Sequence, residues 1–174
     1  MAGMSNKRLQ RELSKVSSTT IKSILSRSLT IHQIQNGLAP GITLVSAPDL
    51  RTWEMDLAIT DNPIYPAHEI YRLKFMFSPS YPIEAPEVVF IGSSNPPRPI
   101  PLHPHIYSNG IICLDLLDSQ GWSPVHNVES ICISIQSMLA GNDKAERPPG
   151  DAEFVRSNRQ RPRDINFLYH DPKV

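Results

Sequence analysis

Two stretches of the chain alternate between apolar and polar residues, and this alternation limits the possible fold more than any other feature. The apolar positions of the first stretch are Trp53, Met55, Leu57 and Ile59, and those of the second are Tyr71, Leu73, Phe75 and Phe77. In a β-strand every second side chain lies on the same side, so an apolar residue at every second position indicates a strand. The pattern therefore predicts a sheet with one face buried and the other polar.

Two shorter segments complete the predicted sheet. Residues 42–47 follow a Pro40-Gly41 turn, and residues 87–91 form a short run rich in β-branched side chains. The connections between the four predicted strands are short and contain Asp, Asn and Pro, which favours antiparallel neighbours. We expect a four-stranded antiparallel meander.

Helical periodicity lies on either side of the strands. Residues 6–16 place apolar side chains on one face and basic side chains on the remainder. Residues 128–140 carry an apolar stripe between Asn127, a suitable N-cap, and Gly141, which can end a helix. With helices separated from a single antiparallel sheet, the sequence predicts an α+β fold with an N-terminal helix, a long loop after the sheet and C-terminal helices.

The domain boundaries follow from changes in composition. We expect one core domain over residues 1–148, with an insertion at about 17–36 that either extends the first helix or forms a loop. Residues 92–105 contain five prolines without periodicity and predict an extended loop. Residues 149–174 are expected to form a basic C-terminal tail, in part flexible.

Charge and cysteine content exclude several classes of protein. The formal net charge is zero, which gives no reason to expect nucleic acid or an anionic membrane as a partner. No apolar run approaches a membrane span, and the start of the chain has no signal-peptide pattern. With only Cys113 and Cys132, both thiols are expected to be free in a reducing compartment, the cytoplasm, the nucleus or both.

Three separated motifs carry the chemistry. They are the stretch from Phe77 to Val88, which includes Tyr81-Pro82; the stretch from His103-Pro104-His105 to Leu117, which includes Ile112-Cys113-Leu114; and Trp122-Ser123-Pro124. Their order, and the eight residues from His105 to Cys113, resemble the ubiquitin-conjugating enzyme family over roughly residues 6–148. The resemblance is strongest to the W-type members, which attach ubiquitin to protein N-termini, because His105 replaces the usual Asn and the tail is similar.

The resemblance implies that Cys113 accepts ubiquitin from an activating enzyme as a thioester and passes it to a protein amine. A thiol suits this task because exchange between thioesters is nearly neutral in energy, and about 3 per cent of a thiol with an ordinary pKa is ionised at pH 7. His103, His105 and Asp115 are the other predicted catalytic residues. His105 is a candidate donor to the oxyanion, His103 is expected to make a structural hydrogen bond, and Asp115 or Glu146 is a candidate for lowering the pKa of the acceptor amine.

The family also implies two protein-binding surfaces. Ile83, Ser123 and Pro124 correspond to the patch that meets RING-type ligases, and Lys7, Arg8 and Arg11 to the surface that meets the activating enzyme. The expected partners are therefore ubiquitin, these two enzymes and protein substrates. No metal or organic cofactor is expected, since the activating enzyme consumes the ATP.

Other readings of the same residues remain open at this stage. The modifier can be a ubiquitin-like protein, or the chain can be a non-catalytic scaffold that binds ubiquitin, although such scaffolds lack the cysteine. Pro96-Pro97-Arg98-Pro99 matches a minimal ligand for Pro-binding adaptor domains, and a loop that braces the active site is the favoured alternative. A zinc site is disfavoured because His103 and His105 form the one compact ligand pair. Cys132 is expected to be a core residue.

Overall fold

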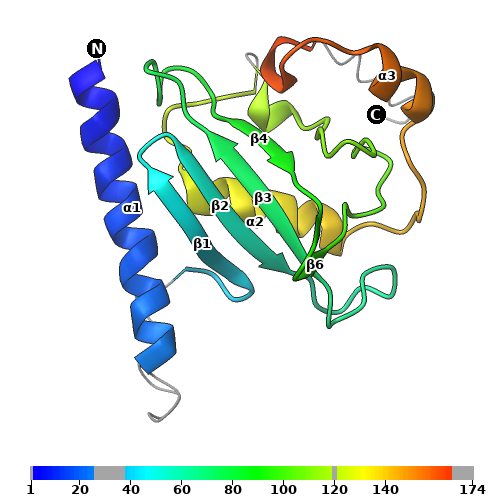
Figure 1. Ribbon diagram of the computed structural model, residues 1–174, viewed down its shortest axis with the longest axis horizontal. Coiled ribbons are helices and arrows are strands. Elements are labelled where there is room, and N and C mark those ends of the chain that lie inside the picture. The colour runs from blue at the N-terminus through cyan, green and yellow to red at the C-terminus, as the bar shows by residue number, and fades with distance from the viewer. Residues whose placement is uncertain (1, 26–37, 119–120, 166–174) are drawn as a thin grey trace.

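Four antiparallel strands form the centre of the molecule, in the order in which they occur along the chain. The computed structural model describes residues 2–25, 38–118 and 121–165, with side chains of the first range described for residues 3–17. The strands are β1 (Ile42–Asp49), β2 (Thr52–Ala58), β3 (Ile70–Met76) and β4 (Glu87–Phe90). This confirms the predicted meander, and Figure 1 shows its twist.

The register of the sheet explains the alternation in the sequence. Trp53 lies opposite Phe75, and Leu57 lies opposite Tyr71. Each of these four side chains is at most 1% exposed, so the apolar positions of both strands lie on the same, inner face. The core of the molecule lies between this face and the helix that crosses it.

That helix is α2 (Val128–Ala140), which has the predicted bounds. Asn127 accepts a hydrogen bond from the backbone of Ser130, and the Ser130 side chain accepts one from the Asn127 backbone. This reciprocal pair satisfies two donors at the start of the helix. Gly141 is the C-cap, and most of the apolar stripe of α2, including Ile131 and Ile135, is buried, while Met138 is partly buried. The prediction of this helix is confirmed.

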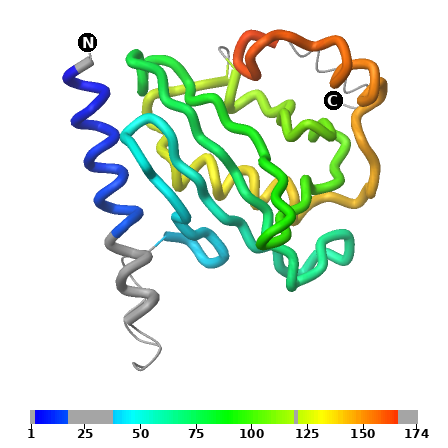
Figure 2. Tube along the Cα trace, in the orientation of Figure 1, coloured from blue at the N-terminus to red at the C-terminus, as the bar shows by residue number. Residues whose placement is uncertain are grey.

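The N-terminal helix is longer than predicted. α1 spans Ala2–Leu25, whereas the apolar periodicity indicated residues 6–16. It lies along the β1 edge of the sheet (Figures 1 and 2). Leu9 and Val16 are buried there, as expected of its apolar face. The predicted insertion at 17–36 therefore begins as a continuation of α1, and its residues 26–36 lie outside the described residues.

Glu12 of α1 joins the two main helices. Its carboxylate accepts hydrogen bonds from Arg8, from the Tyr81 hydroxyl at 2.8 Å and from the backbone N–H of Val128 at 3.1 Å. The Val128 N–H is one of the donors that a helix leaves unsatisfied at its start, where a negative charge is favoured. Glu12 thus fixes α1 against the N-terminus of α2.

The proline-rich stretch contains structure that the sequence did not predict. β5 (Ser93–Ser94) and β6 (Pro97–Arg98) form a small hairpin within the expected extended loop. Arg98 donates to Asp56 on β2 at 2.8 Å, and this contact fixes the hairpin to the outer face of the sheet. Pro96 lies in the hairpin turn, whereas Pro97 and Arg98 form β6. The four residues of the candidate adaptor motif therefore do not form one extended segment.

The chain after residue 148 continues as two short helical elements. α3 spans Asp151–Ser157, and the 3-10 helix η4 spans Pro162–Asp164. In Figure 1 both lie along the upper part of the view, with η4 near the start of β4. Of the predicted tail, residues 166–174 are outside the described part of the chain. Within the described residues, no helix combines the length and apolar character that crossing a membrane requires.

Candidate active site

A tight turn brings Cys113 to its position. The backbone N–H of Gly110 donates to the Tyr107 carbonyl at 2.8 Å, and the carbonyl of Gly110 accepts from the Phe90 N–H at 2.9 Å. Gly110 has a φ of 89°, and a Cβ there would lie 1.9 Å from the Phe90 carbonyl oxygen. Only glycine satisfies both conditions. The turn therefore joins the segment that leads to Cys113 to the end of β4.

Cys113 itself is partly exposed, between buried residues. Its backbone N–H donates to the His105 carbonyl at 2.8 Å, while Ile112 before it and Leu117 after it are buried. Leu117 belongs to the 3-10 helix η3 (Asp115–Leu117). The backbone of Cys113 is thus fixed on both sides while the residue keeps access to solvent, as a nucleophile requires.

His103 is a buried structural residue. It is 5% exposed, and its Nδ1 accepts the backbone N–H of His105 at 2.9 Å. The ring also bonds to the backbone of Met138 on α2. Burial lowers the pKa of His103 to about 4, so the ring is neutral at physiological pH. The bond from the His105 backbone to Nδ1 matches the predicted structural hydrogen bond.

His105, Asp115 and Glu146 are exposed. The ring centroid of His105 lies 5.4 Å from that of His103, and its contact with Cys113 runs through the backbone. Asp115 is the first residue of η3, two positions after Cys113. Their roles toward an oxyanion or an acceptor amine stay predictions.

Tyr107 is a site residue to which the sequence analysis gave no role. Burial raises the pKa of its hydroxyl, and the charges of Cys113 and Asp151 raise it further. The hydroxyl therefore stays protonated at neutral pH. Its ring stacks on Phe154 of α3, with centroids 3.8 Å apart, and Asp151 accepts the backbone N–H of Ser108 at 2.7 Å. The signal in the sequence was an aromatic residue within the Cys113 motif.

Arg147 is a second residue whose role the sequence did not reveal. Its guanidinium donates to the carbonyl oxygens of Ile100 at 3.0 Å, Pro101 at 2.6 Å and Ile106 at 3.0 Å. These carbonyls lie on both sides of the His103-containing segment. One partly buried cation therefore satisfies the carbonyl groups of a loop that forms few ladder bonds. The sequence showed Arg147 only as the residue before Pro148-Pro149.

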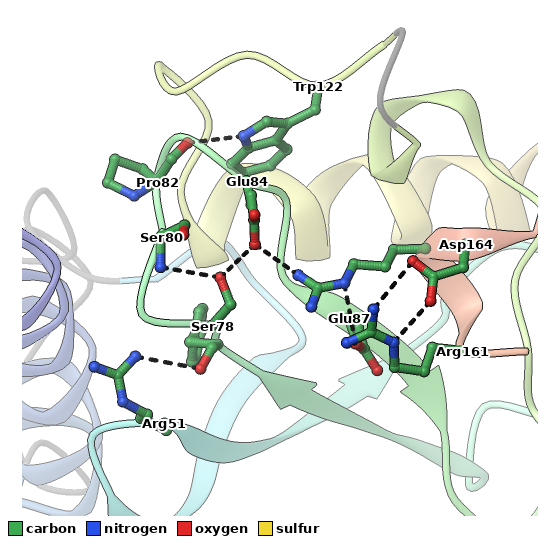
Figure 3. A network of polar contacts seen from close by, with 11 residues as sticks. Arg51, Ser78, Ser80, Pro82, Glu84, Glu87, Trp122, Arg161 and Asp164 are labelled. Carbon is green, nitrogen blue, oxygen red and sulfur yellow. Dashed lines mark hydrogen bonds and ion pairs between the residues drawn. The ribbon is translucent and has the colours of Figure 1, made fainter. Parts of the chain in front are cut away.

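The predicted ligase-facing residues lie on two adjacent loops. The Trp122 indole N–H donates to the Pro82 carbonyl at 2.8 Å, which joins the loop of Ile83 to that of Ser123 and Pro124 (Figure 3). Ile83 is 64% exposed, and Val125, which the sequence analysis did not name, is 78% exposed. The exposed Ile83 and Val125 side chains leave these connected loops accessible to a protein partner.

The basic residues of α1 divide into two groups. Lys7 and Arg11 are exposed and line a shallow hollow on the outer side of the helix. Arg8 instead faces inward, where it pairs with Glu12 and donates to the His126 carbonyl at 2.9 Å. The structure therefore leaves Lys7 and Arg11 available for the predicted activating-enzyme surface, while Arg8 serves to hold α1 in place.

Comparison with known proteins identifies the family of this chain. The family model for ubiquitin-conjugating enzymes matches residues 8–167. A Caenorhabditis elegans protein named ubiquitin-conjugating enzyme E2 W is 33% identical over the full length of both chains. A Dictyostelium discoideum protein, named a probable ubiquitin-conjugating enzyme E2 W, is 40% identical over 78% of this chain and 86% of its own.

A solved structure extends the likeness to the fold. The crystal structure of the ubiquitin-conjugating enzyme UbcA1 from Agrocybe aegerita superposes with a TM-score of 0.75 and is 36% identical. The match covers 91% of this chain and 98% of that one. The chain belongs to the ubiquitin-conjugating enzyme family.

Proposed function

We propose that Cys113 is the residue that carries ubiquitin as a thioester. The observation that supports this most directly is the contrast between the two cysteines. Cys113 is partly exposed on a fixed turn beside Tyr107, whereas Cys132 is fully buried in α2, where burial raises the pKa of its thiol. A thiolate is the reactive form, and only an accessible thiol meets a protein-sized acyl donor.

The reaction has two steps. The Cys113 thiolate attacks the thioester carbonyl of ubiquitin on the activating enzyme, and collapse of the tetrahedral intermediate releases that enzyme's thiolate. An acceptor amine then attacks the new thioester, a C–N bond forms, the C–S bond breaks, and the amine proton passes to solvent. Both steps develop negative charge on the carbonyl oxygen. We propose the Tyr107 hydroxyl, whose pKa is raised by burial and by the charges of Cys113 and Asp151, as a donor to this oxygen.

The acceptor in this proposal is the α-amine of a substrate. With ordinary pKa values, about 10 per cent of α-amines and about 0.04 per cent of lysine side chains are neutral at pH 7. A site with little power to deprotonate lysine therefore favours α-amines by availability alone. Two features of the sequence support this preference: His105 stands in place of the family's usual Asn, and the C-terminal sequence is similar to that of the W-type members.

The partners follow from the surfaces of the structure. The exposed Lys7 and Arg11 of α1 are proposed to meet the activating enzyme, and Ile83 with Ser123 and Pro124 a RING-type ligase. The enzyme is proposed to use no metal or organic cofactor, with ATP consumed by the activating enzyme. Free thiols indicate a reducing compartment, so we place it in the cytoplasm, the nucleus or both.

A discharge assay tests this function. Enzyme charged with ubiquitin is offered two peptides at pH 7: one with a free N-terminus and no lysine, the other acetylated with a single lysine. We expect discharge to the free N-terminus to be faster by at least about tenfold, because a larger fraction of the α-amine than of the lysine amine is neutral at pH 7. The matched variant His105→Asn should narrow this ratio. Equal rates with both peptides for the wild type would contradict the proposed acceptor.

A further inference from the structure

The described C-terminal residues end in a short segment that the proposed reaction does not use. We call residues 162–165, which are η4 and Ile165, the C-terminal clamp. Pro162 and Arg163 line a small hollow together with Pro86 and Leu117, and Ile165 is only 9% exposed. Figure 1 shows the chain after α3 returning to the start of β4, against which η4 packs. The clamp is therefore packed against the core domain, although Pro86, Leu117 and β4 are distant from it in the sequence.

Arg163 makes the polar contacts of the clamp with the core domain. Its guanidinium lies 2.9 Å from Glu84 Oε2 and 3.2 Å from Glu87 Oε1, and the side chain is 20% exposed. Figure 3 shows Glu84 and Glu87, the two carboxylates of this network, together with the neighbouring Arg161 and Asp164. Arg161 is 59% exposed and lies 3.9 Å from Glu87, with Asp164 as its near partner. Arg163 is thus the principal cation that joins the clamp to Glu84.

Glu84 belongs to the ligase-facing loop, residues 78–84. Its carboxylate also accepts the Ser78 hydroxyl at 2.8 Å, and the backbone N–H groups of Ile83 and Glu84 both donate to the Ser80 carbonyl. The exposed Ile83 side chain directly precedes Glu84. A group that holds the Glu84 carboxylate therefore limits the directions in which Ile83 can point.

We propose that Arg163 is a positioning residue for ligase-dependent transfer, because it holds Glu84 and thereby fixes Ile83 for contact with the ligase. This inference rests on the proposed function for one element, the role of Ile83. It adds that the C-terminal clamp, a segment outside the loops that meet the ligase, sets the conformation of the ligase-facing loop.

Amide hydrogen exchange tests the positioning without any ligase. In Arg163→Gln, the amides of Ile83 and Glu84 are expected to exchange up to about fivefold faster. This is the size of change expected when a partly exposed ion pair is lost. The amides of β2 and α2 should not change, which shows that the core remains folded. The control is Arg159→Gln, since Arg159 is exposed and donates to the carbonyls of Arg156 and Asn158 in its own segment.

The reaction is then followed with a RING domain that accelerates discharge of the wild-type enzyme. Arg163→Gln should charge and discharge normally without the RING domain, and should need up to about five times more RING domain for half-maximal acceleration. Glu84→Gln should reproduce this effect. The double variant should be no worse than either single variant, because both remove the same pair.

Several results would overturn the inference. These are unchanged exchange at Ile83 and Glu84, an unchanged response to the RING domain, or an equal loss of the reaction with and without it. The variant Ile83→Ala separates this failure from failure of the proposed function. If Ile83→Ala keeps the full RING response, the ligase-facing surface itself is wrong; if it loses the response while Arg163→Gln keeps it, only the role of Arg163 is wrong.

Discussion

At the scale of single residues, the surroundings of a side chain decide what its chemistry does. The apolar periodicity of residues 128–140 predicted Cys132 as a core residue, and its complete burial confirms this. A structural hydrogen bond was expected of His103, and its Nδ1 accepts one from the His105 backbone. The role of Tyr107 was not, because it depends on stacking with Phe154, which lies 47 positions further along the chain. No local pattern contains that contact.

His103 gives a prediction about pH. Its pKa is about 4 in the folded state and about 6.5 in the unfolded chain, so between these values only the unfolded state binds the proton. Stability is therefore complete above about pH 6.5 and is lost as the pH falls toward 4.

Urea unfolding at several pH values measures this effect. Between pH 7 and pH 5 the wild-type free energy of unfolding should fall by about 2 kcal/mol more than that of His103→Gln, which has no ring to protonate. Parallel pH profiles for the two proteins would contradict the assigned pKa shift.

At the scale of elements, signals within a segment were sufficient where the segment carries its own boundaries. α2 has a cap at Asn127, a terminator at Gly141 and an apolar stripe between them, and its bounds were predicted correctly. α1 has weaker markers, since the Ser/Thr-rich residues 17–20 favour neither helix nor loop. The β5–β6 hairpin was missed because its prolines cannot donate ladder bonds and Arg98 reaches Asp56 only in the folded sheet.

The contact between α1 and α2 leads to a prediction about Glu12. Its side chain is 10% exposed and accepts hydrogen bonds from Tyr81 and the Val128 backbone. Glu12→Gln removes the charge and one acceptor, and should lower the free energy of unfolding by about 1.5–3 kcal/mol. Denaturant unfolding checks this, with Glu153→Gln on exposed α3 as a control expected within about 0.5 kcal/mol. A loss no larger than the control's would show that Glu12 does not join the helices.

At the scale of the whole molecule, the C-terminal region connects parts that the sequence keeps separate. Arg147 bonds to the loop that precedes Cys113, Phe154 stacks on Tyr107, and Arg163 pairs with the ligase-facing loop. The motifs predict which residues belong to the active site and its surfaces, and these assignments stay predictions. They could not predict how residues 147–165 hold these parts, because each contact joins positions more than 40 residues apart.

The central claim, that Cys113 carries ubiquitin, is tested most directly by a charging assay. Wild type, Cys113→Ala and Cys132→Ala are each incubated with activating enzyme, ATP and ubiquitin, with a ubiquitin-like modifier in parallel, and run on a non-reducing gel. We predict a reductant-sensitive ubiquitin adduct in wild type and Cys132→Ala that is absent in Cys113→Ala. An adduct that persists in Cys113→Ala, or forms only with the ubiquitin-like modifier, would contradict the claim.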